Sequence, residues 1–344
     1  MRIAAVSHAL PSRRTTNADI VDLVREHSVP RLGAAGADTV AARVARFLAE
    51  AGTDVRYRLA DGEKAIDVVL RAARDALAAA GVQSRDVDLV IYAGVARGWL
   101  EPATATAIQA ELGLERATSF DVLDACAGWL RALHVVRGHL RDGEHRVALI
   151  VNCECGLYRA YGDFAFDDAG AVEHRLAGYT IGEAATAAIV TASAADDTTF
   201  VFRTFPQHYR LCMLPLPALG DFSPASPDAR WVPEQLFSLS GPLVAAGVRR
   251  LLDVWDDSPA LRARHHDLVV GHNPSEGACA LVARRLGVAD RYVPTHRAYG
   301  NTVSAALPLG LSVAQQSGRL RRGDRVLLAV GSAGITVGFA SLTF

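Results

Sequence analysis

The sequence predicts an α/β layered fold. Segments 88–94 and 146–151 are apolar at nearly every position, as expected of strands that are covered on both faces. Amphipathic segments with helical spacing, such as 65–81, lie between them. This alternation, in a chain of 344 residues of which 50% are hydrophobic, is typical of sheets covered by helices around a large core.

The elements of the first half follow in order from the N-terminus. Residues 2–7 predict a strand, and Asn17 is the expected cap of a helical turn over 20–26. Residues 28–63 show a less regular pattern. The remaining predictions are helices over 65–81 and 103–112, strands over 88–94, 120–123 and 146–151, and a helix that begins near Ala127.

The second half of the chain repeats the pattern of the first. Residues 267–270 resemble residues 88–91 in sequence, and residues 325–328 resemble residues 146–149. The two segments of each pair are 179 positions apart. A common register over a half-chain predicts an internal duplication, in which Cys126 falls opposite Ala305.

We therefore expect two similar halves, residues 1–192 and residues 193–344. The boundary is placed at the polar turn that begins at Ser193. Residues 203–235 hold six prolines and no clear periodicity. This segment is expected to be an irregular insertion that lines a pocket or a subunit surface.

Composition excludes several classes of function. The formal net charge is −1 with acidic and basic residues well mixed, so nothing indicates a nucleic-acid partner or a polybasic membrane anchor. The sequence shows no bilayer-spanning apolar run and no signal peptide. Five irregularly spaced cysteines do not suggest a disulfide framework, and no second ligand pair follows Cys153 and Cys155 at zinc spacing. We therefore expect a soluble cytoplasmic protein without a metal site.

The candidate nucleophile is Cys126, on a tight turn between the predicted strand 120–123 and a helix. The apolar positions of that helix are Leu130, Leu133, Val136 and Leu140. Free amides at the start of a helix lower the pKa of a nearby thiol and make it nucleophilic. A buried structural thiol fits the local sequence equally well.

Three places in the second half could assist Cys126. His272 directly follows a predicted strand, and Asn301 precedes a predicted helix. Gly334 ends a turn of small residues that could offer a backbone amide. Each has a plain structural alternative, namely a satisfied loop histidine, a helix cap and an ordinary turn.

Motifs along nearly the whole chain resemble the thiolase-like condensing enzymes, most closely the β-ketoacyl-acyl-carrier-protein synthase III group. The matching motifs, in the family's order, are Leu10-Pro11, Thr16-Asn17, Ala125-Cys126-Ala127-Gly128, the strand that ends at His272, Tyr299-Gly300-Asn301-Thr302, and Gly334 with Thr336 and Gly338. The resemblance implies a thiolase-like five-layered αβαβα fold built from two duplicated halves, usually as a homodimer. It also implies that Cys126, His272 and Asn301 form a Cys-His-Asn set.

The resemblance further implies a chemistry for these residues. Cys126 would take an acyl group from a thioester of coenzyme A or an acyl carrier protein, while the amides of Cys126 and Gly334 bind the oxyanion. His272 and Asn301 would donate hydrogen bonds to a second thioester and stabilise an enolate, usually formed by decarboxylation of a malonyl unit. The enolate would attack acyl-Cys126 and give a β-keto product. No metal or redox cofactor is implied.

The chain departs from the family's pattern after His272. The group usually has Gln-Ala-Asn and then an Arg that helps to bind coenzyme or carrier, whereas Ser275 stands at the Asn and Gly277 at the Arg. Of the family's Trp- and Arg-rich early segment, Arg56 and Arg58 remain. We therefore expect a role in specialised polyketide, antibiotic or fatty-acid-type biosynthesis rather than in housekeeping fatty-acid initiation.

The segment Trp99-Leu100-Glu101-Pro102 resembles the thiolases that join two long acyl chains head to head. In those enzymes the glutamate reaches the site across the dimer and acts as a base. Glu101 would then deprotonate carbon and make decarboxylation unnecessary. A residue in the first turn of a helix, favoured there by the helix dipole, is an equally good interpretation of Glu101.

Two other functions stay open at this point. The acyl group on Cys126 could pass to a hydroxyl or amine acceptor, but the presence of both His272 and Asn301 favours condensation, because ester formation needs a base more than two donors. The chain could also be a noncatalytic partner subunit of a ketosynthase pair. Such subunits commonly lack the nucleophile, which this chain keeps.

Overall fold

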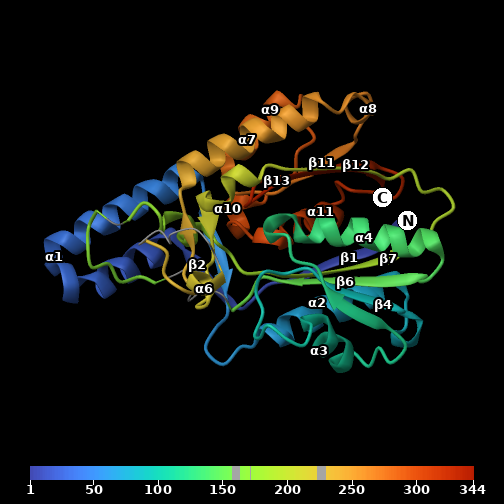
Figure 1. Ribbon diagram of the computed structural model, residues 1–344, viewed down its shortest axis with the longest axis horizontal. Coiled ribbons are helices and arrows are strands. Elements are labelled where there is room, and N and C mark those ends of the chain that lie inside the picture. Colours follow the sequence, from blue (N-terminus) through green and yellow to red (C-terminus); the bar gives the residue numbers. More distant parts are fainter. Residues whose placement is uncertain (157–162, 171, 223–229) are drawn as a thin grey trace.

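The computed structural model of the chain describes residues 1–156, 163–170, 172–222 and 230–344. Two larger sheets form its framework (Figure 1). The first has the order β1-β7-β6-β4-β5, with β1 Arg2–Ala9, β4 Leu89–Tyr92, β5 Thr118–Asp121, β6 Val147–Cys153 and β7 Ala185–Thr191. The second has the order β11-β12-β13-β8, with β8 Thr199–Thr204, β11 Leu268–Gly271, β12 Arg325–Ser332 and β13 Thr336–Thr343.

Helices form three layers around these sheets (Figure 1). The outer face of the first sheet is covered by α2 (Ala65–Ala80) and α3 (Thr104–Glu111), and the outer face of the second by α7 (Ser240–Asp256) and α9 (Glu276–Arg285). Between the sheets lie α4 (Gly128–Asp142) and α11 (Ala306–Gln316). The order αβαβα confirms the predicted layered α/β fold class.

The central layer holds the largest of the buried apolar clusters. Trp129 and Leu133 on α4 pack with Leu307 and Leu311 on α11, and side chains from both sheets complete the cluster. Burial of an apolar side chain of this size stabilises a fold by about 1.5 to 3 kcal/mol. This packing fixes α4, and therefore the turn before it, against the second half of the chain.

The two sheets share a strand pattern. In each, two parallel strands (β4 and β6, or β11 and β12) are followed by an antiparallel one. Asp88 accepts a hydrogen bond from the Arg146 amide at 2.8 Å, and Asp267 accepts one from the Arg325 amide at the same distance. The first sheet uses strands from residues 2–191 and the second from 199–343, while the proposed division at residue 192 stays a prediction.

The turns before the two central helices also correspond. The 3-10 turns η2 (Ala125–Ala127) and η5 (Val303–Ala305) lead into α4 and α11, and each begins at a residue with positive φ, 42° at Ala125 and 52° at Val303. This correspondence places Cys126 opposite Ser304. The sequence offset predicts Ala305 instead, one residue further along.

The segment 28–63 is more regular than its sequence suggests. Helix α1 runs from Asn17 to Ala51 and is kinked at Gly33, where φ is 67° and ψ is 173°. The kink and Pro30 interrupt the apolar spacing, which explains why the pattern looks irregular. The N-cap is Thr16, whose hydroxyl accepts from the Asp19 amide at 3.3 Å, so the prediction that Asn17 caps the helix is wrong.

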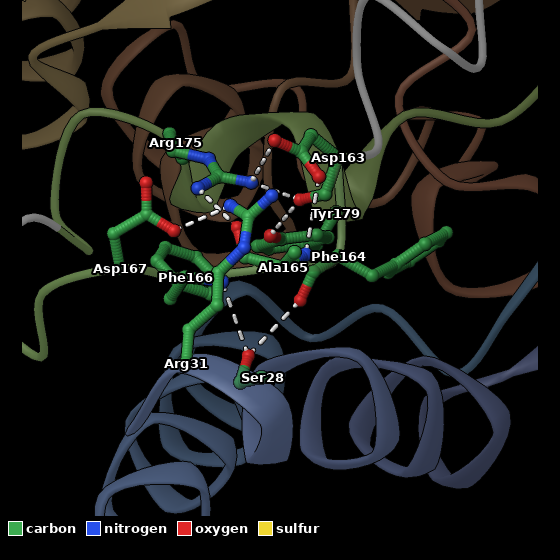
Figure 2. A network of polar contacts seen from close by, with 9 residues as sticks. All are labelled: Ser28, Arg31, Asp163, Phe164, Ala165, Phe166, Asp167, Arg175 and Tyr179. Atoms are coloured by element: carbon green, nitrogen blue, oxygen red, sulfur yellow. Dashed lines mark hydrogen bonds and ion pairs between the residues drawn. The ribbon is translucent and has the colours of Figure 1, made fainter. Parts of the chain in front are cut away.

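Helix α1 is tied to residues 163–180 by the polar network drawn in Figure 2. Ser28 donates to the Phe164 carbonyl and accepts from the Phe166 amide, both at 3.2 Å. Tyr179 donates to the Asp163 carbonyl at 2.8 Å. These contacts hold the turn η3 (Leu176–Thr180), which lies beside the candidate site.

Smaller elements complete the fold. They are the strand pairs β2 (Arg13–Thr16) with β3 (Val55–Arg58) and β9 (Cys212–Met213) with β10 (Phe237–Ser238), the helices α6 (Leu219–Phe222), α8 (Pro259–Arg262) and α10 (His296–Tyr299), and the turns η1 (Ser84–Asp86) and η4 (Pro206–Leu211). The described part of the predicted insertion 203–235 thus holds short elements, and residues 223–229 of it lie outside the described residues. In the described chain, no helix has both the length and the apolar character to cross a membrane.

Asp196 is predicted to make stability depend on pH. Burial opposes its charge, but hydrogen bonds from Thr198 and from Arg137, the latter at 2.7 Å, hold the pKa of Asp196 below its ordinary value. A lowered pKa adds stability that is present above the unfolded value and is lost as pH falls toward the folded one. Asp196→Asn should therefore cost about 1 kcal/mol at pH 7 and clearly less near pH 2, measured by urea unfolding, because the loss begins only below the unfolded pKa.

The control is Asp61→Asn, because Asp61 pairs with Arg13 in full contact with solvent and should leave the urea midpoint nearly unchanged. An equal effect of Asp196→Asn at both pH values would contradict the prediction.

Candidate active site

The structure brings Cys126, His272 and Asn301 to one cavity of about 620 Å³. Cys126 lies in η2 after β5, His272 directly follows β11, and Asn301 lies between α10 and η5. All three side chains line the cavity, and most of the other lining residues are apolar. The cavity therefore combines a thiol, an imidazole and a carboxamide in surroundings that exclude most polar groups.

The turn that carries Cys126 is tightly packed. A Cβ atom at Gly128 would lie 2.8 Å from the Ala93 carbonyl oxygen, so this position needs a glycine. Ser332, at the end of β12, donates to the Asp124 carbonyl at 3.1 Å and joins the second sheet to the turn. These contacts fix Cys126 at the junction of the two halves.

The expected lowering of the Cys126 pKa is wrong for the free protein. Burial raises the pKa of the thiol well above its ordinary value, and Cys212 and Glu154 raise it further. The amides of Ala333 and of Cys126 itself act in the opposite direction but do not outweigh burial. Cys126 is thus a neutral thiol at pH 7, and its proton must leave during any nucleophilic attack.

One hydrogen bond fixes the neutral ring of His272, and the other ring nitrogen lies against Asn301. Its Nδ1 lies 2.9 Å from the Gly331 carbonyl oxygen, and its Nε2 lies 3.2 Å from Asn301 Oδ1. Because a carbonyl can only accept, the hydrogen of the neutral ring is assigned to Nδ1. Burial lowers the pKa of His272, so the ring is neutral at pH 7 and its Nε2 lone pair is available for a proton.

Asn301 is positioned by both halves. Its backbone amide donates to the Thr180 carbonyl at 2.8 Å, and its backbone carbonyl accepts from the Gly182 amide at 3.0 Å. Its side-chain Oδ1 accepts from the Val303 amide at 3.0 Å, which assigns the oxygen and leaves Nδ2 on the other side. A Cβ at Gly182 would overlap the Tyr299 carbonyl oxygen, so this approach depends on glycine.

The oxyanion role of the Gly334 amide stays a prediction, and the structure adds the neighbouring amide of Ala333 as a candidate. Ala333 and Ile335 line the cavity, whereas Gly334 is absent from the described lining. The amide that acts on the Cys126 thiol is that of Ala333. Sequence reasoning had no signal for this residue, because a backbone amide is independent of the side chain.

Glu101 is not brought to the cavity by its own chain. It is exposed in the loop before α3, and it does not line the cavity. Its chain neighbour Leu100 is also exposed, 72% accessible, and so is Leu123 after β5, 61% accessible. The structure therefore does not place Glu101 beside Cys126, and its role as a base stays a prediction.

The departures after His272 have local explanations. Ser275 is the N-cap of α9, where its hydroxyl accepts from the Ala278 amide at 3.2 Å. Gly277 is exposed on that helix and faces open space. Arg56 is fully buried and donates to Asn17, so it supports the fold and does not form an entrance for a coenzyme.

The cavity continues between α7 and α9. The lining residues of α9 and its flanks form one stripe at helical spacing, Ser275, Ala278, Cys279, Val282, Ala283 and Leu286. The residues of α7 that line the cavity are Ser240, Gly241, Leu243, Val244, Ala245, Gly247, Val248 and Leu251. The cavity is therefore lined along most of the length of both helices of the outer layer. We call this part the α7–α9 channel.

Solved structures share this architecture. Xanthomonas campestris OleA, in a crystal structure with bound lauric acid and lauroyl-CoA, superimposes with a TM-score of 0.83 at 22% identity and covers 99% of this chain and 98% of its own. FabH from Xanthomonas oryzae gives a TM-score of 0.80 at 21% identity, with 99% and 98% covered. The fold is therefore that of the thiolase-like condensing enzymes.

Sequence comparison narrows the class. The family model described as "3-Oxoacyl-[acyl-carrier-protein (ACP)] synthase III C terminal" matches residues 257–344. The β-ketoacyl-[acyl-carrier-protein] synthase III of Symbiobacterium thermophilum is 31% identical over 297 residues, 84% of this chain and 87% of the relative. That of Rhizorhabdus wittichii is 27% identical over 353 residues, 99% and 98% of the two chains. The chain belongs to the β-ketoacyl-[acyl-carrier-protein] synthase III family, a family of thioester-condensing enzymes.

Proposed function

We propose that this enzyme loads a long acyl group from a thioester onto Cys126 and condenses it with a second thioester to form a carbon–carbon bond. The observation that carries the proposal is the single cavity lined by Cys126, His272 and Asn301. Membership of the synthase III family supports the reaction class. The proposed chemistry requires no metal or redox cofactor.

In the first step the Cys126 sulfur attacks the thioester carbonyl and the donor thiol leaves. The amides of Cys126 and Ala333, which act on the sulfur, would hold the developing oxyanion. The Nε2 lone pair of His272 can take the thiol proton and keep it, while the leaving thiolate takes a proton from solvent. The step exchanges one thioester for another, so no oxidant or reductant is needed.

In the second step His272 and Asn301 act as donors. Once protonated, His272 Nε2 carries a hydrogen that can bond to Asn301 Oδ1 or to a substrate carbonyl. Together with Asn301 Nδ2 it would stabilise the enolate of the second thioester, formed by decarboxylation or by proton abstraction. The enolate carbon attacks acyl-Cys126, and the thiolate of Cys126 leaves and takes its proton back from His272.

The α7–α9 channel supports a long linear acyl group. The stripe from Ser275 to Leu286 spans about 16 Å at the helical rise of about 1.5 Å per residue. A staggered alkyl chain advances about 1.3 Å per carbon, so the channel matches a chain of about 12 carbons. Each buried methylene contributes about 0.8 kcal/mol, or roughly a fourfold preference per methylene.

We further propose that the enzyme acts as a homodimer in which Glu101 enters the cavity of the partner. Leu100 and Leu123 are exposed beside the edge strand β5, and Asp121 on that strand binds the amides of Thr104 and Ala105 at the start of α3. Pairing of two such surfaces would cover these apolar side chains. Glu101 would then serve as the base for a condensation without decarboxylation.

The two steps can be separated by substitution at the cavity. Cys126→Ala should abolish acyl loading, because the sulfur is the attacking atom. His272→Ala should still load Cys126, but more slowly. The rate of product formation should fall roughly 100-fold or more, because the hydrogen-bond donor to the enolate is lost. Intact-mass spectrometry of the acyl-enzyme, with quantified product, measures both. Turnover of His272→Ala at the parent rate would remove His272 from the mechanism.

Chain-length preference tests the α7–α9 channel. Gly247→Leu adds a side chain into open space at a helical residue that lines the channel, so it should narrow the channel without a clash. Loading of a dodecanoyl thioester should fall at least roughly tenfold, since several methylenes lose burial, while acetyl loading is unchanged.

The matched control is Gly138→Leu on the exposed side of α4, which makes the same exchange away from the channel and should load dodecanoyl like the parent. Undiminished dodecanoyl loading by Gly247→Leu would show that the chain lies elsewhere.

Complementation tests Glu101. If Glu101 acts in the partner's cavity, a mixture of Glu101→Ala and Cys126→Ala chains allowed to exchange subunits should recover up to about a quarter of parent turnover, whereas each variant alone is inactive. Turnover of Glu101→Ala alone at the parent rate, with malonyl-free substrates, would exclude Glu101 as the base.

A further inference from the structure

Glu154 is a fully buried carboxylate that the proposed reaction does not use. It follows the end of β6, behind the wall of the cavity. Its Oε1 accepts from the Val95 amide at 3.0 Å and its Oε2 from the Ala96 amide at 3.2 Å. It also forms a close hydrogen bond with the Ser304 hydroxyl, so one carboxylate joins a first-half loop to the turn η5 of the second half.

The groups that Glu154 holds are direct neighbours of the reacting residues. Val95 and Val303 pack in the same small apolar cluster as Cys126. Val303 also donates its amide to Asn301 Oδ1 at 3.0 Å. A shift of Ser304, the next residue in η5, would therefore move the amide that orients Asn301.

Ser304 occupies the place in η5 that Cys126 occupies in η2. Its oxygen accepts from Asn152 Nδ2 at 2.6 Å, and its single hydrogen has two possible acceptors, Glu154 and the Ala93 carbonyl at 3.0 Å. When Glu154 is charged, the Ser304 hydrogen points to it. When Glu154 is protonated, it can donate to Ser304, and the Ser304 hydrogen turns to Ala93.

We propose that Glu154 is a positioning residue that holds the Asn301 turn through Ser304 and whose charge controls the reactivity of the Cys126 thiol. The proposal deepens the proposed function, because positioning of Asn301 matters for the second step. The charge effect is independent of that function, since it acts on the free thiol.

The electrostatic surroundings fit this role. Burial raises the pKa of Glu154 to about 7, although the hydrogen bonds from Ser304, Val95 and Ala96 lower it. The titratable groups that face it are Tyr92 on β4, Cys153 at the end of β6, Cys155 directly after Glu154, and Cys126 on η2. Burial raises the pKa of Tyr92 and Cys126, and the contact with Cys153 raises that of Cys155, so all three are neutral at pH 7. As pH rises through about 7, Glu154 gains a charge that opposes the Cys126 thiolate.

Alkylation of Cys126 by iodoacetamide between pH 6 and 9, read by peptide mass spectrometry, tests the charge effect. Glu154→Gln keeps the shape and removes the charge, so Cys126 should react roughly tenfold faster at pH 8, which corresponds to a decrease of about one unit in the thiol pKa. The control is Glu183→Gln, which removes a buried carboxylate held by the Leu59 and Gly156 amides and should leave the rate unchanged. Equal rates of Cys126 alkylation in the parent and in Glu154→Gln would overturn the proposed effect of the Glu154 charge on the thiol.

Ser304→Ala tests the positioning effect. This test remains possible even if Glu154→Gln does not fold. The Ser304→Ala variant keeps the carboxylate but removes its link to η5. Acyl loading should stay within about twofold of the parent, while condensation of loaded Cys126 slows roughly tenfold, because Asn301 loses its fixed position. Condensation at the parent rate would overturn the positioning role. If no thioester loads even the parent enzyme, the proposed function fails, and the alkylation result alone decides the charge effect.

Discussion

The burial of α4 and α11 between the two sheets is the constraint on which the site depends. Each helix begins at a turn with positive φ, and the two turns face one another where the halves meet. Gly128 allows η2 to approach the Ala93 carbonyl, and the Ser304 hydroxyl of η5 lies 3.0 Å from the same carbonyl oxygen. The turns η2 and η5 are therefore coupled and cannot move independently. Residues that are distant in sequence are held together at the cavity by this coupling.

An apolar cavity disfavours the charged forms of the side chains that line it. Burial keeps both the Cys126 thiol and the His272 imidazole neutral at pH 7. A neutral pair reacts by passing one proton from sulfur to nitrogen as the acyl bond forms, and the resulting imidazolium has a hydrogen where the neutral ring has a lone pair. The same protonation change that completes acylation thus prepares His272 to donate in the condensation.

Much of the fold followed from the sequence, because apolar strands and amphipathic helices have distinct periods. The strand ending before His272 and the turn at Cys126 are examples, and the match to family motifs led to the cavity. The continuation of helix α1 beyond residue 28 was missed because Pro30 and Gly33 break its spacing. The sign of the Cys126 pKa shift, the Ala333 amide and the partner of Glu154 depend on packing between distant segments, which local patterns do not contain.

The mechanism depends on one step, in which the carbonyl carbon of the acyl group on Cys126 forms a bond to the α-carbon of the second thioester. The most direct measurement uses a dodecanoyl thioester labelled with a heavy carbon isotope at its carbonyl, a second thioester as acceptor, and NMR of the product. The account predicts that the labelled carbon becomes a ketone bonded to the acceptor's α-carbon. Label found only in an ester, an amide or a free acid would contradict it.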